Sequence, residues 1–127
     1  MKKDSDEIRA LIVDDERLAR ENLKELLRDQ WDVRVVGEAR NADEAERMIA
    51  ALNPNLVFLD IQMPGGSGFD LLARLEDTPS IIFVTAFDQY AIRAFEVNAL
   101  DYLLKPIEPE RLRNALRRAA FRLPSFD

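Results

Sequence analysis

Short apolar runs alternate along the chain with segments whose apolar residues recur at helical spacing. The runs lack the polar alternation of half-exposed strands, which is typical of strands buried on both faces of a parallel sheet. This pattern predicts an α/β fold, in which helices cover both faces of an open sheet of about five strands. We predict strands at 8–13, 33–38, 56–60, 81–85 and 99–104. We predict helices at 16–29, after an N-cap at Asn41, from Ser67 or Gly68, at 88–97 and at about 108–122.

The alternation is not interrupted by a linker, an internal repeat or a low-complexity segment, so the chain reads as one domain. We expect this domain to fill residues 8–122. Residues 1–7 are polar and are expected to form a disordered tail. Residues 123–127 are expected to be a C-terminal tail or the start of a linker to an output domain absent from this chain.

The composition excludes several classes of site. The chain contains neither Cys nor His, which excludes disulfides, thiol chemistry, His-ligated metals and Ser-His-Asp catalysis. It has 18 basic and 24 acidic residues, so we do not expect it to bind nucleic acid by itself. Its apolar stretches fall far short of the roughly 20 residues that span a bilayer, and its first residues lack the apolar segment of a secretory signal. We therefore expect a cytoplasmic protein with no membrane partner.

Polar side chains terminate four of the five apolar runs. The first run ends in Asp14 and Asp15, the third in Asp60, the fourth in Thr85 and the fifth in Lys105. Any one of these acids has a simpler interpretation, because Asp after a strand is often a helix cap. In an open parallel sheet, however, ligands bind outside the carboxyl ends of the strands. The pattern therefore predicts a site where these groups meet.

The charges of this group indicate what it binds. Three carboxylates within about 5 Å of one another repel by roughly 3 kcal/mol per pair at an effective dielectric constant near 20. A divalent cation and the Lys105 ammonium together would neutralise the carboxylates of Asp14, Asp15 and Asp60. An all-oxygen ligand set favours Mg²⁺, which usually also binds a phosphate oxygen. The sequence therefore predicts a magnesium site that accepts a phosphoryl group.

Several motifs together resemble the receiver domain of bacterial response regulators. They are DD at 14–15, FLDIQMPGGSGFDLL at 58–72, VTAF at 84–87 and DYLLKP at 101–106. The resemblance covers about residues 8–122, and it implies a flavodoxin-like, doubly wound parallel sheet with strand order 2-1-3-4-5. It also implies a bound Mg²⁺, a sensor histidine kinase as partner and a cis bond before Pro106. The stretch 85–106 is similar, more narrowly, to receivers that carry a LytTR-type DNA-binding output domain.

The resemblance assigns a role to each acidic residue of the predicted site. Asp60 would be the phosphoacceptor and would also contact Mg²⁺. Asp14 and Asp15 would hold Mg²⁺, one of them directly and the other directly or through water. The backbone carbonyl of Gln62 would be a further ligand.

The resemblance also assigns roles to residues around the acceptor. Thr85 and Lys105 would bind the phosphoryl oxygens after transfer. Tyr102 would be a switch residue that turns inward when Thr85 moves, although a half-buried strand aromatic is the simpler interpretation. Gln62 and Phe87 would flank the route of attacking water and so tune the lifetime of the phosphorylated state.

We therefore expect a phosphoacceptor domain that switches conformation and controls an output, most simply transcription. DNA would be reached only through an output domain outside this chain. The domain would assist its own phosphorylation and slow autodephosphorylation without being an enzyme. One alternative is a stand-alone receiver that acts by protein–protein interaction. Another is an aspartyl-phosphate phosphatase, but such enzymes place their nucleophile on the first strand, whereas Asp60 follows the third.

Two surface features have more than one interpretation. The 87–97 segment carries more apolar residues than one core-facing stripe needs, which indicates either deeper burial or a partner surface. A partner surface would support a homodimer through the 88–118 face. The last predicted helix carries a cluster of arginines, which indicates a solvated face or, alternatively, salt bridges across a dimer. These arginines are Arg111, Arg113, Arg117, Arg118 and Arg122.

Overall fold

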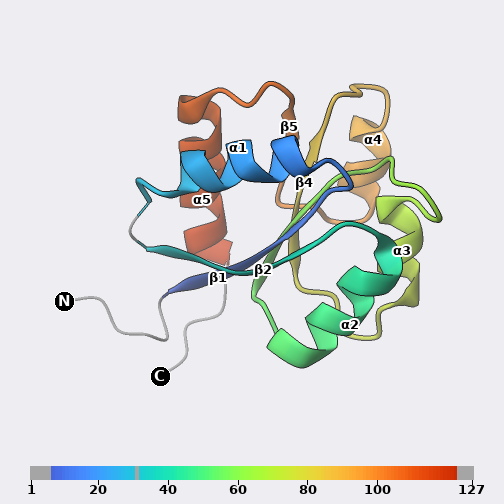
Figure 1. Ribbon diagram of the computed structural model, residues 1–127. Helices are drawn as coiled ribbons and strands as arrows, with labels where there is room; N and C mark the ends of the chain where they lie inside the picture. Colours follow the sequence, from blue (N-terminus) through green and yellow to red (C-terminus); the bar gives the residue numbers. More distant parts are fainter. Residues whose placement is uncertain (1–6, 31, 123–127) are drawn as a thin grey trace.

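A computed structural model describes residues 7–30 and 32–122, which form one five-stranded parallel sheet between two layers of helices (Figure 1). The strands are β1 (Ile8–Val13), β2 (Val33–Ala39), β3 (Leu56–Leu59), β4 (Ser80–Thr85) and β5 (Asp101–Leu104). The helices are α1 (Arg17–Leu27), α2 (Ala42–Leu52), α3 (Gly68–Arg74), α4 (Ala91–Glu96) and α5 (Pro109–Arg122). The strand order is β2-β1-β3-β4-β5, so the predicted flavodoxin-like, doubly wound fold is confirmed.

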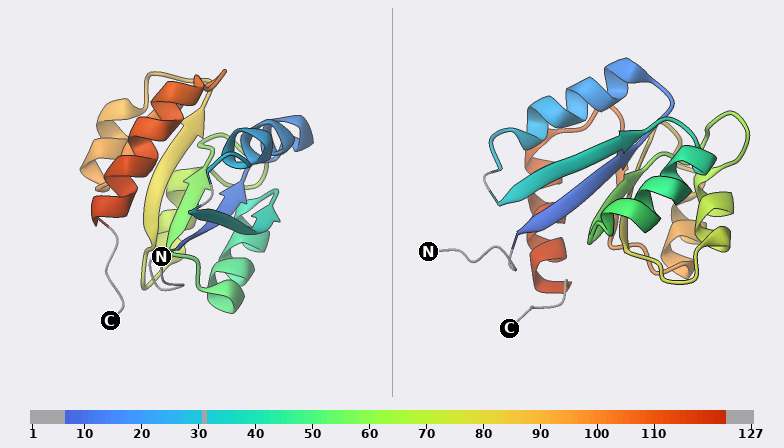
Figure 2. Two further views of the ribbon diagram at one scale, coloured as in Figure 1. Left: turned by 90° about the vertical axis from the view of Figure 1, so that its left-hand side faces the viewer. Right: turned by 60° about the horizontal axis from the view of Figure 1, so that its bottom comes forward.

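The sheet is buried on both faces, as its uniformly apolar strands predict. Along β1, Ile8, Ala10 and Ile12 face one core, which α1 and α5 cover. The alternate residues Leu11 and Val13 face a second core, which α2, α3 and α4 cover. Figure 2 shows the twisted sheet lying between these two helical layers. The two cores fix the sheet and leave the loops at its carboxyl edge free to carry a site.

Two helices begin where the sequence places their caps. The Asn41 side chain accepts a hydrogen bond from the Glu44 backbone N–H at 2.8 Å, at the start of α2. The Ser67 hydroxyl accepts from the Asp70 N–H, and the Asp70 carboxylate accepts from the Ser67 N–H, which is a reciprocal capping box at the start of α3. Both helices therefore begin at a residue that a local hydrogen bond specifies.

Two elements begin later than predicted. The predicted 88–97 helix begins only at Ala91, because residues 88–90 form a turn in which the Ala91 N–H donates to the Asp88 carbonyl at 3.4 Å. The predicted 99–104 strand begins only at Asp101, because the Ala99 N–H is bonded to the Ala94 carbonyl at the end of α4. The other element bounds differ from the predictions by one or two residues, which is the usual uncertainty of helix and strand ends.

The Lys105–Pro106 peptide bond is cis, as the resemblance implies. None of the helices that the structure describes is long and apolar enough to cross a membrane. Residues 1–6 and 123–127 of the two expected tails lie outside the described residues.

Candidate functional site

The sheet ladder continues past the strand ends and places four polar residues at one edge. The Asp60 N–H donates to the Val13 carbonyl at 2.9 Å, and the Lys105 N–H donates to the Thr85 carbonyl at 2.9 Å. Asp14 follows β1 directly, and its N–H donates to the end of β2. Because β1, β3, β4 and β5 are neighbours in the sheet, these residues are fixed side by side by backbone hydrogen bonds.

A glycine allows α3 to begin against this edge. The Gly68 N–H donates to the Ile61 carbonyl at 2.8 Å. A Cβ atom at position 68 would lie 2.6 Å from the Asp60 carbonyl oxygen, which is closer than real Cβ contacts allow. A side chain at this position would therefore push α3 away from the Asp60 backbone.

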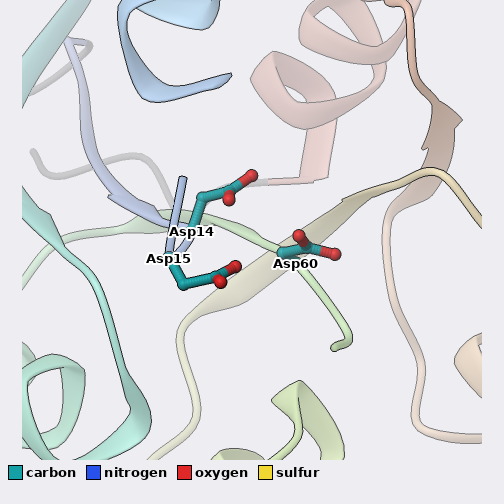
Figure 3. Close-up of side chains that lie close together, drawn as sticks. All are labelled: Asp14, Asp15 and Asp60. Atoms are coloured by element: carbon teal, nitrogen blue, oxygen red, sulfur yellow. The ribbon is translucent and has the colours of Figure 1, made fainter. Parts of the chain in front are cut away.

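Three carboxylates meet at the carboxyl ends of β1 and β3 (Figure 3). Asp14, Asp15 and Asp60 each place one oxygen within 4.8 Å of the others'. Asp14 and Asp60 are buried, whereas Asp15 is exposed to solvent. Oxygen ligands on a partly open cluster suit a hard divalent cation that keeps part of its water shell. The cluster could therefore hold a metal ion of the magnesium type.

The Lys105 ammonium bridges the two buried carboxylates. Its Nζ lies 2.7 Å from Asp14 Oδ2 and 3.2 Å from Asp60 Oδ2, and Glu16 Oε1 is 3.7 Å away. Burial acts to lower the pKa of Lys105, but the hydrogen bond to Asp14 and the nearby negative charges outweigh it and raise the pKa. Lys105 is therefore a fixed positive charge at the centre of the cluster.

The pKa of Asp60 is raised, because the effect of burial outweighs the positive charge nearby. Burial raises its pKa, the Asp14 charge adds to the increase, and Lys105 and the Ile61 N–H only partly oppose them. Its Oδ1 accepts from the Ile61 N–H at 2.7 Å, and its Oδ2 accepts from Lys105. A further cation at the cluster would favour the ionised form, which is the form in which a carboxylate can act as a nucleophile.

Thr85 and Tyr102 both contact the backbone of Phe87. Thr85 is fully buried, and its Oγ1 accepts from the Phe87 N–H at 3.4 Å. Tyr102 is half-buried, and its hydroxyl donates to the Phe87 carbonyl. Burial raises the pKa of Tyr102, so this hydroxyl remains a donor at neutral pH. One residue of the β4–α4 loop therefore links the two side chains that the resemblance pairs as a switch.

Gln62 lies two residues beyond Asp60 and is exposed. Its side-chain Nε2 donates to the Tyr90 hydroxyl at 3.0 Å. Sequence reasoning missed this contact, because the two residues are 28 positions apart and no motif relates Gln62 to Tyr90.

Two arginines of α5 make contacts that neither sequence-based interpretation included. Arg111 and Arg118 each lie 2.7 Å from the Asp101 carboxylate of the same chain, and Arg111 also donates to the Tyr102 carbonyl. Burial acts to raise the pKa of Asp101, but the Arg111 hydrogen bond and the Tyr102 N–H outweigh it and lower the pKa. These two arginines therefore form ion pairs within the chain that hold α5 to β5, a role that sequence reasoning missed.

Three apolar residues of the 87–97 segment lie at the surface. Ile92 and Phe95 are 78% and 82% exposed, and Val97 is 42% exposed. Deeper burial is therefore the wrong interpretation for these three side chains. Phe87 and Tyr90 of the same segment are partly buried, and Tyr90 packs against the core that α2, α3 and α4 cover.

The chain matches the model of a known protein family and several curated proteins. The family model described as the response regulator receiver domain matches residues 10–117. A transcriptional regulatory protein, BtsR, from Salmonella typhi is 56% identical over 113 residues, which are 87% of this chain and 47% of that protein. An uncharacterized response regulatory protein from Vibrio cholerae is 54% identical over 111 residues, 86% of this chain and 47% of that protein. The chain thus spans about half the length of the curated relatives it matches.

Solved structures of response regulator domains are also similar to this chain, at lower sequence identity. The response regulator domain of Thermotoga maritima CheB superposes with a TM-score of 0.82 at 28% identity, over 93% of this chain and 99% of that one. The response regulatory domain of protein mrkE from Klebsiella pneumoniae superposes with a TM-score of 0.80 at 30% identity, over 89% of this chain and 95% of that one.

Proposed function

The chain belongs to the response regulator receiver domain family, and from this premise we propose that it takes a phosphoryl group from a sensor histidine kinase onto Asp60. Receivers are signalling domains that partner with sensor histidine kinases and output domains. One observation carries the assignment to this residue. The Asp60 carboxylate is buried beside Asp14 and Lys105 at the carboxyl edge of the sheet, with one oxygen held by the Ile61 N–H.

The acidic cluster suits a magnesium ion. Asp14, Asp15, Asp60 and the backbone carbonyl of Gln62 are the ligands we propose. The three carboxylates offer oxygen atoms close enough for one ion, and the chain has no His to favour a softer metal. The ion would supply positive charge that neutralises phosphoryl oxygens.

The chain's own groups then account for transfer. An Asp60 Oδ attacks the phosphorus of a phosphohistidine, a P–O bond forms, and the P–N bond breaks with its electron pair left on the imidazole nitrogen. Phosphoryl transfer needs mainly alignment and charge stabilisation, which the Lys105 ammonium and the Thr85 hydroxyl provide. Slow attack of water on the same phosphorus restores the Asp60 carboxylate and releases phosphate. The domain thereby resets itself and acts as a switch, with no separate substrate to turn over.

The switch runs through the β4–α4 loop. A phosphoryl group on Asp60 brings acceptor oxygens that recruit the Thr85 hydroxyl away from the Phe87 N–H. Tyr102, bonded to the Phe87 carbonyl, then turns inward as the loop moves. Gln62 and Phe87 flank the route of attacking water and set the lifetime of the phosphorylated state.

The output we propose is transcription, through a LytTR-type DNA-binding domain of the whole protein. The support is the sequence similarity of 85–106 to receivers with that output, and the name of the transcriptional regulatory relatives. The receiver itself occupies 8–122, between an N-terminal tail at 1–7 and a tail or linker from 123, and it works in the cytoplasm. We further propose that the 88–118 face pairs with a second copy, because Ile92 and Phe95 are exposed there.

Beryllofluoride, a stable mimic of a phosphoryl group on a carboxylate, tests the acceptor site. We expect it to raise the melting temperature of the wild-type protein when Mg²⁺ is present and not in EDTA, because a ligand of the native state alone stabilises that state. The Asp60→Asn variant should show no increase in either buffer. An equal increase in the two proteins would place the binding elsewhere and contradict the proposal.

A further inference from the structure

Tyr90 occupies a position where its residue type is unusual. It is the N-cap of α4, where Ser, Thr, Asp or Asn is normally found because their side chains accept a backbone N–H. Tyr90 makes no side-chain capping hydrogen bond, and α4 is only six residues long. Departures from local folding rules are expected where a residue serves a function. The question is therefore what the Tyr90 side chain does instead.

The Tyr90 hydroxyl connects the loops that follow β3 and β4. It accepts a hydrogen bond from Gln62 Nε2 at 3.0 Å. Gln62 lies in the loop after β3, two residues beyond Asp60, and Tyr90 lies in the loop after β4, five residues beyond Thr85. Because β3 and β4 are neighbours in the sheet, the bond spans the gap between the loops that follow Asp60 and Thr85.

The Tyr90 ring is held in place from several sides. Its centroid lies 6.3 Å from that of Phe87, edge to face, and 6.3 Å from that of Phe69. Phe69 in turn packs against Phe83 at 5.1 Å and lies under the Arg93 guanidinium at 4.1 Å. A ring packed in this way presents its hydroxyl at a fixed point, whereas the exposed Gln62 side chain would otherwise sample many rotamers.

We infer that Tyr90 is a positioning residue that holds the Gln62 side chain between the loops that follow Asp60 and Thr85 and thereby slows loss of the phosphoryl group. The inference rests on the proposed phosphorylation of Asp60. In that loss, a water oxygen bonds to phosphorus, the bond from phosphorus to the Asp60 oxygen breaks with its electrons left on the carboxylate, and the water protons pass to phosphate and solvent. An amide tethered between the two loops obstructs the approach of this water, and a free one does not.

A double-mutant cycle separates this role from a general effect on the fold. The protein is phosphorylated with phosphoramidate and Mg²⁺, the donor is removed, and the decay of the phosphorylated mass is followed in wild type, Tyr90→Phe, Gln62→Ala and the double variant. Tyr90→Phe keeps the ring and its packing and removes only the hydroxyl. We expect it to speed the decay about two- to fivefold, the effect of one hydrogen bond. In the Gln62→Ala background we expect no further acceleration.

Gln89→Ala is the matched control, because it removes another exposed glutamine side chain, from the same loop as Tyr90. Its decay should match that of wild type, and Tyr90→Phe should speed the decay of Gln89→Ala by the same factor as that of wild type. The inference is overturned if Tyr90→Phe decays no faster than wild type, or if it has the same effect with and without Gln62. Absence of any phosphorylated mass in wild type would overturn the proposed function as well, so the two failures are distinguishable.

Discussion

Substitution of Lys105 by Met removes the ammonium that bridges Asp14 and Asp60 while keeping an unbranched side chain of similar length. The lost contacts are 2.7 Å and 3.2 Å long. At an effective dielectric constant of about 20, Coulomb's law gives about 6 and 5 kcal/mol for unit charges at these distances. The carboxylates left behind, with oxygens within 4.8 Å of one another, then repel by about 3 kcal/mol per pair.

These gross energies overstate the change in stability. In wild type the Lys105 ammonium loses hydration on folding, and the variant avoids this cost of several kcal/mol. The carboxylates of the variant can also take up protons or move apart. We therefore expect Lys105→Met to lower the free energy of unfolding by about 2–4 kcal/mol at neutral pH without metal. Mg²⁺ should restore much of this loss, because the cation replaces the missing positive charge, and its stabilising effect should be larger in the variant than in wild type.

Urea unfolding followed by circular dichroism, in EDTA and in Mg²⁺, measures both quantities. Lys24→Met is the matched control, since Lys24 pairs with Glu21 and Glu38 on the surface, with its side chain 30% exposed. It should change the free energy of unfolding little, and equally in both buffers, because ion pairs at the surface contribute little to stability. The reasoning is refuted if Lys105→Met is as stable as wild type in EDTA, or if Mg²⁺ stabilises the variant no more than wild type.

Three further outcomes test separate parts of the structure. Asp15→Ala should weaken Mg²⁺ binding, measured by titration, more than Gln62→Ala does, because Gln62 is proposed to act through its backbone; the reverse order would contradict the ligand assignment. Asp101→Asn should lower the free energy of unfolding by about 1–3 kcal/mol at pH 7, because it breaks charged hydrogen bonds from Arg111. The folded-state pKa of Asp101 is lowered, so the stability difference between wild type and this variant, measured by urea unfolding, should shrink as the pH falls below about 3.8. A difference that does not depend on pH would show that charge is not its cause. Phe58→Ala, at a side chain 1% exposed, should cost about 3–5 kcal/mol in the same assay, and a loss below about 1 kcal/mol would contradict its place in the core.

Backbone regularity explains what the sequence alone could predict. A buried parallel strand is specified by its own apolar run, and parallel strands bring their carboxyl ends to one edge. The meeting of Asp14, Asp60, Thr85 and Lys105 therefore follows from four local patterns and one rule of sheet topology. The cap at Asn41 and the start of α3 at Ser67 or Gly68 are equally local, and both were predicted.

The features that sequence reasoning missed depend on contacts between distant side chains. No periodicity relates Gln62 to Tyr90, and their bond forms only because two loops after neighbouring strands lie side by side. The ion pairs of Asp101 with Arg111 and Arg118 depend in the same way on how α5 lies along β5. The outward direction of Ile92 could not be read either, because a short helix with apolar residues on several faces has no unique inward face.

The most direct test of the central claim is the mass of the intact protein after incubation with phosphoramidate and Mg²⁺. The account predicts that wild type gains about 80 Da, one phosphoryl group, and that Asp60→Asn gains nothing. Fragmentation should place the added mass on the peptide that contains Asp60. Equal labelling of the two proteins, or no labelling of wild type, would contradict the claim that this carboxylate accepts the phosphoryl group.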